Sequence, residues 1–391
     1  MIRTDSPRGK VALMVAHCAG MVDLVALPVW VGVLMAHYHF DPQRAGGLAT
    51  LFLLGAVVAS LSLATRFHRL RGRLLVPISF AVSALAFLGA SLTRDFTVLA
   101  MLHIFAGVAA GAGLSMTHGT IGRSANPHQL FATVGLALGI FAVVFMATVP
   151  QIVTNAGGSA LFLVFAGVML VAAILTAFIY PHSEGSFRAE PATVVRPAPF
   201  PKAVWLGILG VSCMALVQAM VFSFLERMGD SRGFGTQPIN ALLVAVGLVN
   251  LFPAVLASYL QERLDAGRAV LGGALVQGTL AVIMTWSSTF VPYALSASVF
   301  VAVMIFSHTF AFGLLARLDS TGRAVAATPA MLMIGSAIGP ILGGSLVKAF
   351  GYGAIGTAAL TMDLVAAALF AGMLLQRRNV KSRPSPAEHS T

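Results

Sequence analysis

Charged residues are scarce in this sequence of 391 residues. Asp, Glu, Lys and Arg make up 9% of it, whereas a soluble globular domain carries roughly 25%. Apolar residues reach 58%, and the mean hydropathy of +0.90 leaves too little polar surface to cover a water-soluble body of this size. This composition excludes a soluble enzyme and a disordered chain, and it predicts a polytopic membrane protein.

Cysteine and catalytic motifs are equally rare. The two cysteines, Cys18 and Cys213, both lie inside apolar runs, which excludes a disulfide framework and a cysteine-based metal finger. The sequence also lacks the G-x-S-x-G, H-E-x-x-H and P-loop patterns of hydrolases, metalloproteases and nucleotide-binding proteins. We therefore expect no enzymatic activity, no metal and no cofactor.

The sequence does contain twelve apolar runs, each long enough to supply the about 20 helical residues that cross a bilayer. Each run is continuous and does not alternate with period two, which favours helices over a β-barrel. The runs cover residues 11–36, 45–65, 74–93, 97–120, 129–153, 159–180, 203–226, 238–260, 269–287, 290–316, 324–347 and 353–376. The predicted fold class is an all-α membrane protein with twelve transmembrane helices.

The basic residues indicate how these helices are oriented. The net charge of +11 would suggest nucleic-acid binding in a soluble protein, but here the cations lie in short gaps between apolar runs, as in membrane topology. With the N-terminus inside, only five of the 24 Lys and Arg residues fall outside: Arg44, Arg94, Arg227, Arg232 and Lys348. We expect both termini in the cytoplasm, a bacterial inner membrane as the location, and no nucleic-acid partner.

A polar, proline-rich stretch at 181–201 divides the chain into two halves. The predicted organisation is a six-helix bundle at 1–181, a cytoplasmic linker at 182–202, a second six-helix bundle at 203–376 and a cytoplasmic tail at 377–391. A weak internal repeat at an offset of about 195 residues supports this division. It relates Cys18 and Asp23 to Cys213 and Gln218, Gly72-Arg73 to Gly267-Arg268, and Arg123 to Arg317.

Together these features resemble the major facilitator superfamily over essentially the whole chain, and specifically its drug:proton antiporter-like branch. The segment Arg66-Phe-His-Arg69-Leu-Arg71-Gly-Arg73 is similar to the family's G-x-x-x-D-R-x-G-R-R loop without its acidic residue. The resemblance implies two pseudo-repeat bundles, a substrate site between them, and a monomer. It also implies that Arg69 and Arg73 latch the cytoplasmic face; the alternative is that they only set topology.

A second motif lies in the eleventh run, where Gly335-Ser-Ala-Ile-Gly339-Pro340-Ile-Leu-Gly343-Gly344 is similar to a G-x-x-x-G-P-x-x-G-G element. In the family that element belongs to helix five of antiporters, so its position here does not establish export. Glycines four residues apart let helices approach closely, and Pro340 frees a backbone carbonyl. Gly339 and Pro340 therefore serve either a gating bend or plain close packing.

Asp23 is the main candidate for proton coupling, because ionisable residues within spans are costly to bury. It lies five residues before Pro28, which cannot donate a hydrogen bond to the carbonyl of Leu24, so we expect a bent or loosened helix beside the carboxylate. Trp30 shares its helical face and is a candidate for substrate binding. The alternative for Asp23 is a neutral structural hydrogen bond to another helix.

Polar residues in other spans supply further candidates. His103 and His118 lie on one face of the fourth run, and His308 lies in the tenth; histidine titrates near neutrality and can relay protons. We assign His103 and His308 to proton coupling and His118 to substrate binding, with simple packing as the alternative. Gln218 and Asn250 are candidates for hydrogen bonding to substrate. His17 is expected to be a packing residue, and Asp363 in the twelfth run must face inward or be protonated.

The substrate class follows from what the spans lack. No Lys or Arg lies in the middle of a span, and a buried cation would be expected for anionic substrates. With 26 Phe and 17 Met, the sequence favours a small neutral or cationic amphipathic organic molecule. The prediction is a secondary transporter that works by alternating access, coupled to protons and favouring efflux. The alternative is a proton-coupled uptake permease for a neutral aromatic or vitamin-like metabolite.

Overall fold

The computed structural model describes residues 2–64, 70–182, 199–318 and 328–381, and every regular element within them is an α-helix. Twelve segments are long and apolar enough to cross a membrane, which confirms the predicted fold class and the number of spans. The first half contains α1 (Pro7–Gly20), α2 (Val22–Ala36), α3 (Pro42–Ala64), α4 (Gly72–Ser91), α5 (Phe96–Gly122), α6 (Pro127–Ala156) and α7 (Ser159–Ile179). The second contains α8 (Lys202–Phe222), α9 (Leu225–Ser231), α10 (Thr236–Val249), α11 (Pro253–Leu260), α12 (Ala266–Trp286), α13 (Phe290–Leu318), α15 (Thr328–Phe350) and α16 (Tyr352–Lys381).

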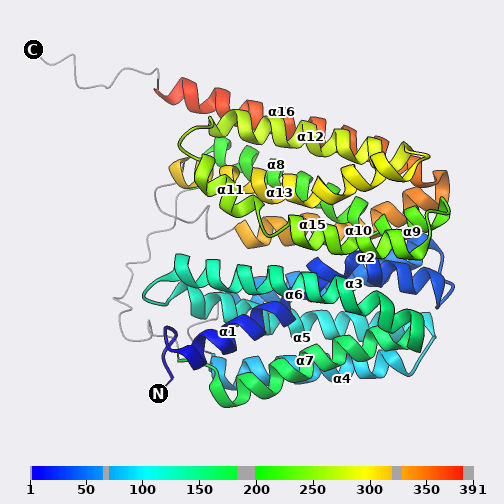
Figure 1. The fold of residues 1–391 in the computed structure, drawn as a ribbon. Coiled ribbons are helices and arrows are strands. Elements are labelled where there is room, and N and C mark those ends of the chain that lie inside the picture. The colour runs from blue at the N-terminus through cyan, green and yellow to red at the C-terminus, as the bar shows by residue number, and fades with distance from the viewer. Residues whose placement is uncertain (1, 65–69, 183–198, 319–327, 382–391) are drawn as a thin grey trace, which may run out of the picture.

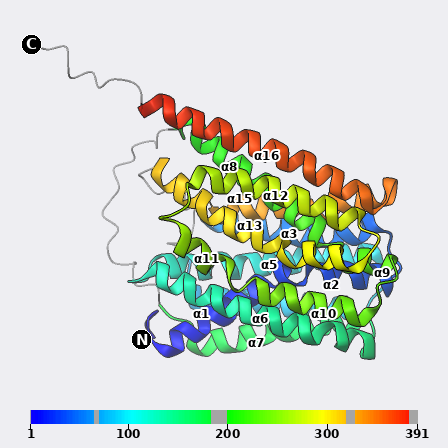
Figure 2. The same ribbon diagram turned by 45° about the horizontal axis from the view of Figure 1, so that its top comes forward.

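The two halves stack on one another, with the start of α1 and the end of α16 at the same end of the molecule (Figure 1). We call this the terminal end and the opposite one the distal end. In the first half α3 packs on α5 and α4 on α7; in the second α12 packs on α16 and α8 on α15. The halves meet through α3 with α15 and α6 with α10, and Figure 2 also shows α3 and α15 side by side.

Helix starts follow local sequence signals. The Asp95 carboxylate accepts a hydrogen bond from the Val98 backbone N–H at 2.8 Å, and the Asp265 carboxylate accepts one from Arg268 at 2.9 Å. Such caps satisfy backbone donors that have no partner within the helix. Gly72 and Gly267, which the repeat relates, lie at the starts of α4 and α12, so they occupy matching places in the two halves.

Three predicted spans are interrupted, and the sequence pattern marks only one of these breaks directly. The first span breaks at Met21, between α1 and α2, two residues before Asp23, where a loosened helix was expected; α2 itself continues through Pro28. The seventh breaks between α8 and α9, and the eighth between α10 and α11. Only the last has a proline directly after it, Pro253, which disfavours helix in the preceding residue.

Two predicted boundaries need comment. Helix α16 continues to Lys381, so the expected tail at 377–391 begins inside a helix. Residues 183–198 of the predicted linker, residues 382–391 and the loop residues 65–69, including Arg69, lie outside the described residues. Arg73 is described and is exposed near the start of α4.

Candidate functional site

Asp23 lies in the first turn of α2, two residues after the break at Met21, and its side chain is half-buried. The start of a helix carries a partial positive charge that stabilises a carboxylate. Partial exposure together with this helix start allows both the ionised and the neutral form of the side chain. The geometry is therefore compatible with reversible proton binding.

Trp30 and His103 lie together in an aromatic cluster within the first half. Both are fully buried, and their ring centroids are 5.4 Å apart. His103 Nδ1 is 2.6 Å from the backbone O of Leu99, and the Trp30 ring packs on Phe52 and Phe165. These contacts fit the packing alternative for His103, and they place Trp30 in the core of the bundle.

His118 forms an imidazole pair with His17. The Nδ1 atom of His17 and the Nε2 atom of His118 are 3.0 Å apart, and one of them must donate while the other accepts. His17 is buried, as a packing residue should be. The pairing joins α1 to α5, and it was not expected because the interpretation treated the two histidines separately.

Three candidates of the second half have polar atoms without a hydrogen-bond partner among the described residues. They are Oε1 of Gln218 on α8, Oδ1 of Asn250 at the end of α10, and Nδ1 of His308 on α13. A buried polar atom is usually paired with protein or ordered water. These atoms are thus available to a bound molecule or to water.

Asp363 faces the interior of the second half and is fully buried, which agrees with the first of the two expected positions. A Cβ added to Gly278 of α12 would lie 3.1 Å from the Cβ of Asp363. Neither carboxyl oxygen has a hydrogen-bond partner within the described ranges. The nearby Gln277 amide donates to the backbone O of Met214 at 3.2 Å.

The glycine-proline element lies in α15, where it contacts both halves. A Cβ on Gly339 would lie 2.6 Å from the backbone N of Met220 on α8, and one on Gly46 of α3 would lie 2.1 Å from the backbone O of Pro340. The Ile341 N–H donates to Oγ1 of Thr50 at 3.1 Å. These contacts match the close-packing alternative for Gly339 and Pro340, and they join the two halves.

An ion pair lies beyond this contact at the distal end. The Lys348 ammonium is 3.1 Å from Oδ2 of Asp41 and donates to Oε1 of Gln43 at 3.2 Å. Partial burial alone would raise the pKa of Asp41, but the Arg44 backbone N–H and the Lys348 ammonium hold that pKa below its usual value. Both side chains are partly exposed, so solvent screens the pair.

Glu226 on α9 is a functional candidate that the sequence interpretation missed. A Cβ added to Gly32 of α2 would lie 2.8 Å from Oε2 of Glu226, so this carboxyl is packed directly on the opposite half. Beside it lies a cavity of about 60 Å³ whose polar lining includes His37, Thr154, Thr236 and Asn240. The sequence feature that could have identified Glu226 is its position as a lone carboxylate at the last residue of the predicted span 203–226.

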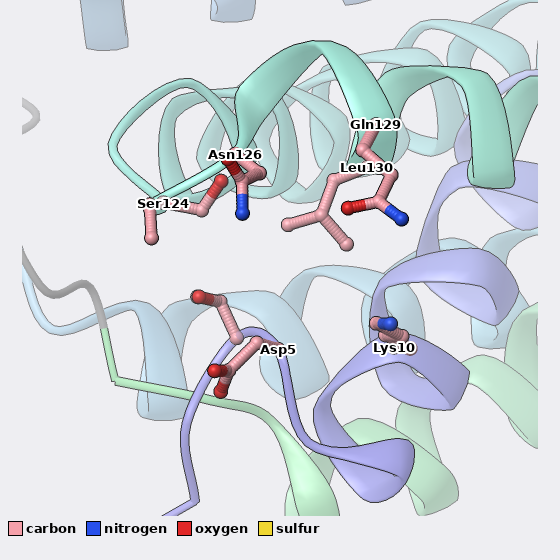
Figure 3. Close-up of a pocket in the computed structure, with 8 residues that line it drawn as sticks. Asp5, Lys10, Ser124, Asn126, Gln129 and Leu130 are labelled. Carbon is pink, nitrogen blue, oxygen red and sulfur yellow. The ribbon is translucent and has the colours of Figure 1, made fainter.

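A second small cavity lies at the terminal end. Figure 3 shows Asp5 and Lys10 facing Ser124 and Asn126, which belong to the segment joining α5 to α6, and Gln129, which lies in the first turn of α6. Its volume of about 30 Å³ accommodates water, whereas pockets for organic ligands begin at roughly 300 Å³. This cavity therefore does not serve as a substrate site.

With the fold and these contacts established, comparison with known proteins identifies the family. The sequence profile of the Major Facilitator Superfamily matches residues 12–321. The chain belongs to this superfamily. No curated protein sequence matches the chain significantly.

Solved structures of transporters share the fold. A bacterial homologue of the human lysosomal transporter Spinster, in an inward-facing and occupied conformation, has a TM-score of 0.71 at 13% identity, covering 97% of this chain and 98% of that one. The nucleoside transporter NupG has a TM-score of 0.69 at 12% identity, covering 95% and 98%. The xylose transporter XylE from E. coli, in an inward-open conformation, has a TM-score of 0.70 at 13% identity, covering 91% and 94%. These neighbours share the fold, and the superfamily to which the chain belongs indicates a membrane transporter.

Proposed function

We propose that this protein is a proton-coupled secondary transporter that exports small neutral or cationic amphipathic organic molecules. The observation that carries the proposal is the half-buried carboxyl of Asp23 in the first turn of α2, beside the break in the first span. The terminal end faces the cytoplasm of a bacterial inner membrane, in keeping with the excess of Lys and Arg in the loops on that side.

Alternating access is supported by where the halves touch. Glu226 meets Gly32, Lys348 meets Asp41, and Ile341 meets Thr50, all in the distal half of the helices. In this state the substrate site is accessible from the terminal end. Breaking these contacts and forming others at the terminal end would expose the same site to the distal side.

Proton coupling follows because a proton and the substrate compete for the carboxyl of Asp23. When the site faces outside, the carboxylate takes up a proton and becomes neutral. When it faces the cytoplasm, the proton leaves, and the ionised carboxylate attracts a cationic or polarised substrate. Gln218, Asn250 and His308 supply unpaired polar atoms that orient the bound molecule, and no Lys or Arg in mid-span repels a cation.

Transport assays in cells and vesicles test substrate class and direction. Ethidium serves as a cationic probe and chloramphenicol as a neutral one, each measured with and without the protein. We expect lower accumulation in cells that contain the protein, and proton-driven uptake of the probes into inside-out vesicles. Unchanged accumulation and toxicity across a broad panel of such compounds would contradict export and favour the uptake permease.

A further inference from the structure

Glu226 lies at a contact between the halves that the coupling scheme above does not use. Its Oε2 atom is buried and has no hydrogen-bond partner within the described part of the chain. The residue opposite, Gly32, belongs to the other half and has no side chain that could pair with it. Desolvation of this unpaired oxygen costs more free energy when the carboxyl is ionised than when it is neutral.

The charged neighbours of Glu226 compensate its charge only in part. Arg227 and Asp230 are close enough to act on it electrostatically, but the guanidinium of Arg227 is engaged with Asp230, Nη1 to Oδ2 at 2.7 Å. Tyr293, from α13, donates its hydroxyl proton to the backbone O of Leu225. From the first half, His37 is the titratable residue lining the same cavity.

The adjacent cavity supplies a route for protons. Its volume of about 60 Å³ has room for a few water molecules, and Thr154, Thr236 and Asn240 offer hydrogen-bonding groups along it. The cavity is bounded by α2, α6, α9 and α10, so it lies on the boundary between the halves. Separation of the halves would enlarge it and hydrate the carboxyl.

We infer that Glu226 is a second proton-binding site, distinct from Asp23, and that its proton occupancy controls closure of the distal end. The protonated carboxyl packs against Gly32 in the closed state. Loss of the proton favours the state in which the halves separate and water surrounds the carboxylate. The inference rests on the proposed function for the assignment of the distal end to the outside, so acidity outside would close that face.

Distance measurements between spin labels test this without any transported substrate. In a Cys18→Ala, Cys213→Ala background, labels are placed at Leu92→Cys and Ser288→Cys, two exposed distal positions in opposite halves. The protein is reconstituted in lipid nanodiscs and measured from pH 5 to pH 8.5. We expect the ratio of long to short distances to rise about tenfold or more with pH, which is the effect of at least one pKa unit of coupling.

Variants of Glu226 test whether this residue causes the change in distance with pH. Glu226→Gln and Glu226→Met keep the side chain neutral and should give short distances at every pH; two variants are used so that one poorly folded protein does not decide the result. Glu226→Asp should keep the response. Glu262→Gln, which removes an exposed carboxyl of the second half in the segment between α11 and α12, is the matched control and should behave as the unmodified protein does.

Several results would overturn the inference. These are a pH-independent distance in the unmodified protein, a preserved response in the two neutral variants, or loss of the response in His37→Gln, which would assign it to the histidine. The proposed function fails separately, through absence of gradient-driven ethidium or chloramphenicol transport. Because the labels report conformation alone, the two failures are distinguishable.

Discussion

Two of the contacts between the halves at the distal end differ in their chemistry. At α3 and α15 the backbone of Pro340 packs on Gly46, and Thr50 accepts a hydrogen bond from Ile341. At α2 and α9 a carboxyl, Glu226, packs on a bare glycine, Gly32. The first contact contains no titratable group apart from the partly exposed pair of Lys348 and Asp41 at its edge, whereas the second depends on the charge of one side chain.

This difference suggests that the two contacts have separate roles. The α3–α15 contact fixes where the halves touch, through shape and backbone hydrogen bonding that are insensitive to pH. The α2–α9 contact makes that closure depend on proton concentration. Substitutions at the first contact should change the open population equally at all pH values, and substitutions at the second should change the pH dependence.

The largest effect is expected from Gly46→Val. A Cβ at this position would stand 2.1 Å from the backbone O of Pro340, which cannot move without displacing α15. We expect the labels at Leu92→Cys and Ser288→Cys to report long distances at every pH and transport to be lost, because overpacking of this kind costs about 1–3 kcal/mol.

Gly47→Val is the matched control for that change. A Cβ on Gly47 would have its nearest neighbour, Cδ1 of Ile341, at 3.8 Å, an ordinary contact distance. The distal end of the Gly47→Val variant should therefore close as it does in the unmodified protein. If the two valine variants behave alike, the α3–α15 contact is not what determines the position of closure.

A smaller effect is expected from Gly32→Ala. The added Cβ would lie 2.8 Å from Oε2 of Glu226, but the flexible glutamate can withdraw, so we expect a penalty of about 1 kcal/mol on closure. The shorter side chain of Glu226→Asp should restore closure in the double variant. Distance distributions of the unmodified protein, the two single variants and the double variant measure how far the two substitutions depend on one another. Additive effects would contradict direct packing of Gly32 on the carboxyl.

Thr50→Val should weaken closure by about 1 kcal/mol. It removes the acceptor for the Ile341 N–H while keeping the shape of the side chain, and one neutral hydrogen bond contributes about that amount. The open fraction should rise by a similar factor at pH 5 and pH 8.5. A change confined to one end of the pH range would show that this contact is coupled to titration.

The smallest effect is expected from Asp41→Asn. The pair with Lys348 is partly exposed, so it stabilises closure by no more than about 0.5 kcal/mol. Because the pKa of Asp41 is lowered in this state, its contribution is present above the ordinary pKa of aspartate and is lost as pH falls through the lowered one. Asp41→Asn should therefore leave the response between pH 5 and pH 8.5 unchanged; a flattened response in the distance measurement would identify Asp41 as the sensor.

The sequence predicted the parts of the fold that depend on local composition. The twelve spans follow from apolar length. The break before Pro253 was not predicted, although the chemistry of proline accounts for it. The break at Met21 lies beside Asp23, where a loosened helix was expected from Pro28, but α2 continues through Pro28, so the proline does not by itself account for the position of the break. Tertiary packing decides such breaks, and periodicity alone does not encode it.

Site residues were harder to predict because their roles depend on distant partners. Trp30 and His103 share a core cluster that a single helical face cannot reveal. Glu226 was overlooked because its significance comes from Gly32, almost half the chain away in sequence. Asp23 could be selected from sequence because an acid within an apolar span is unusual wherever it packs.

The central claim is that Asp23 couples proton movement to transport, and ethidium flux in proteoliposomes tests it most directly. Two modes are compared for Asp23→Asn: accumulation driven by a pH gradient, and exchange of labelled for unlabelled ethidium without a gradient. Asp23→Glu, which keeps a carboxyl, and Asp363→Asn, which removes a buried acid outside the proposed site, serve as controls. We predict that Asp23→Asn loses gradient-driven accumulation and retains exchange, while both controls retain both modes. Gradient-driven accumulation at the unmodified level in Asp23→Asn would contradict the claim.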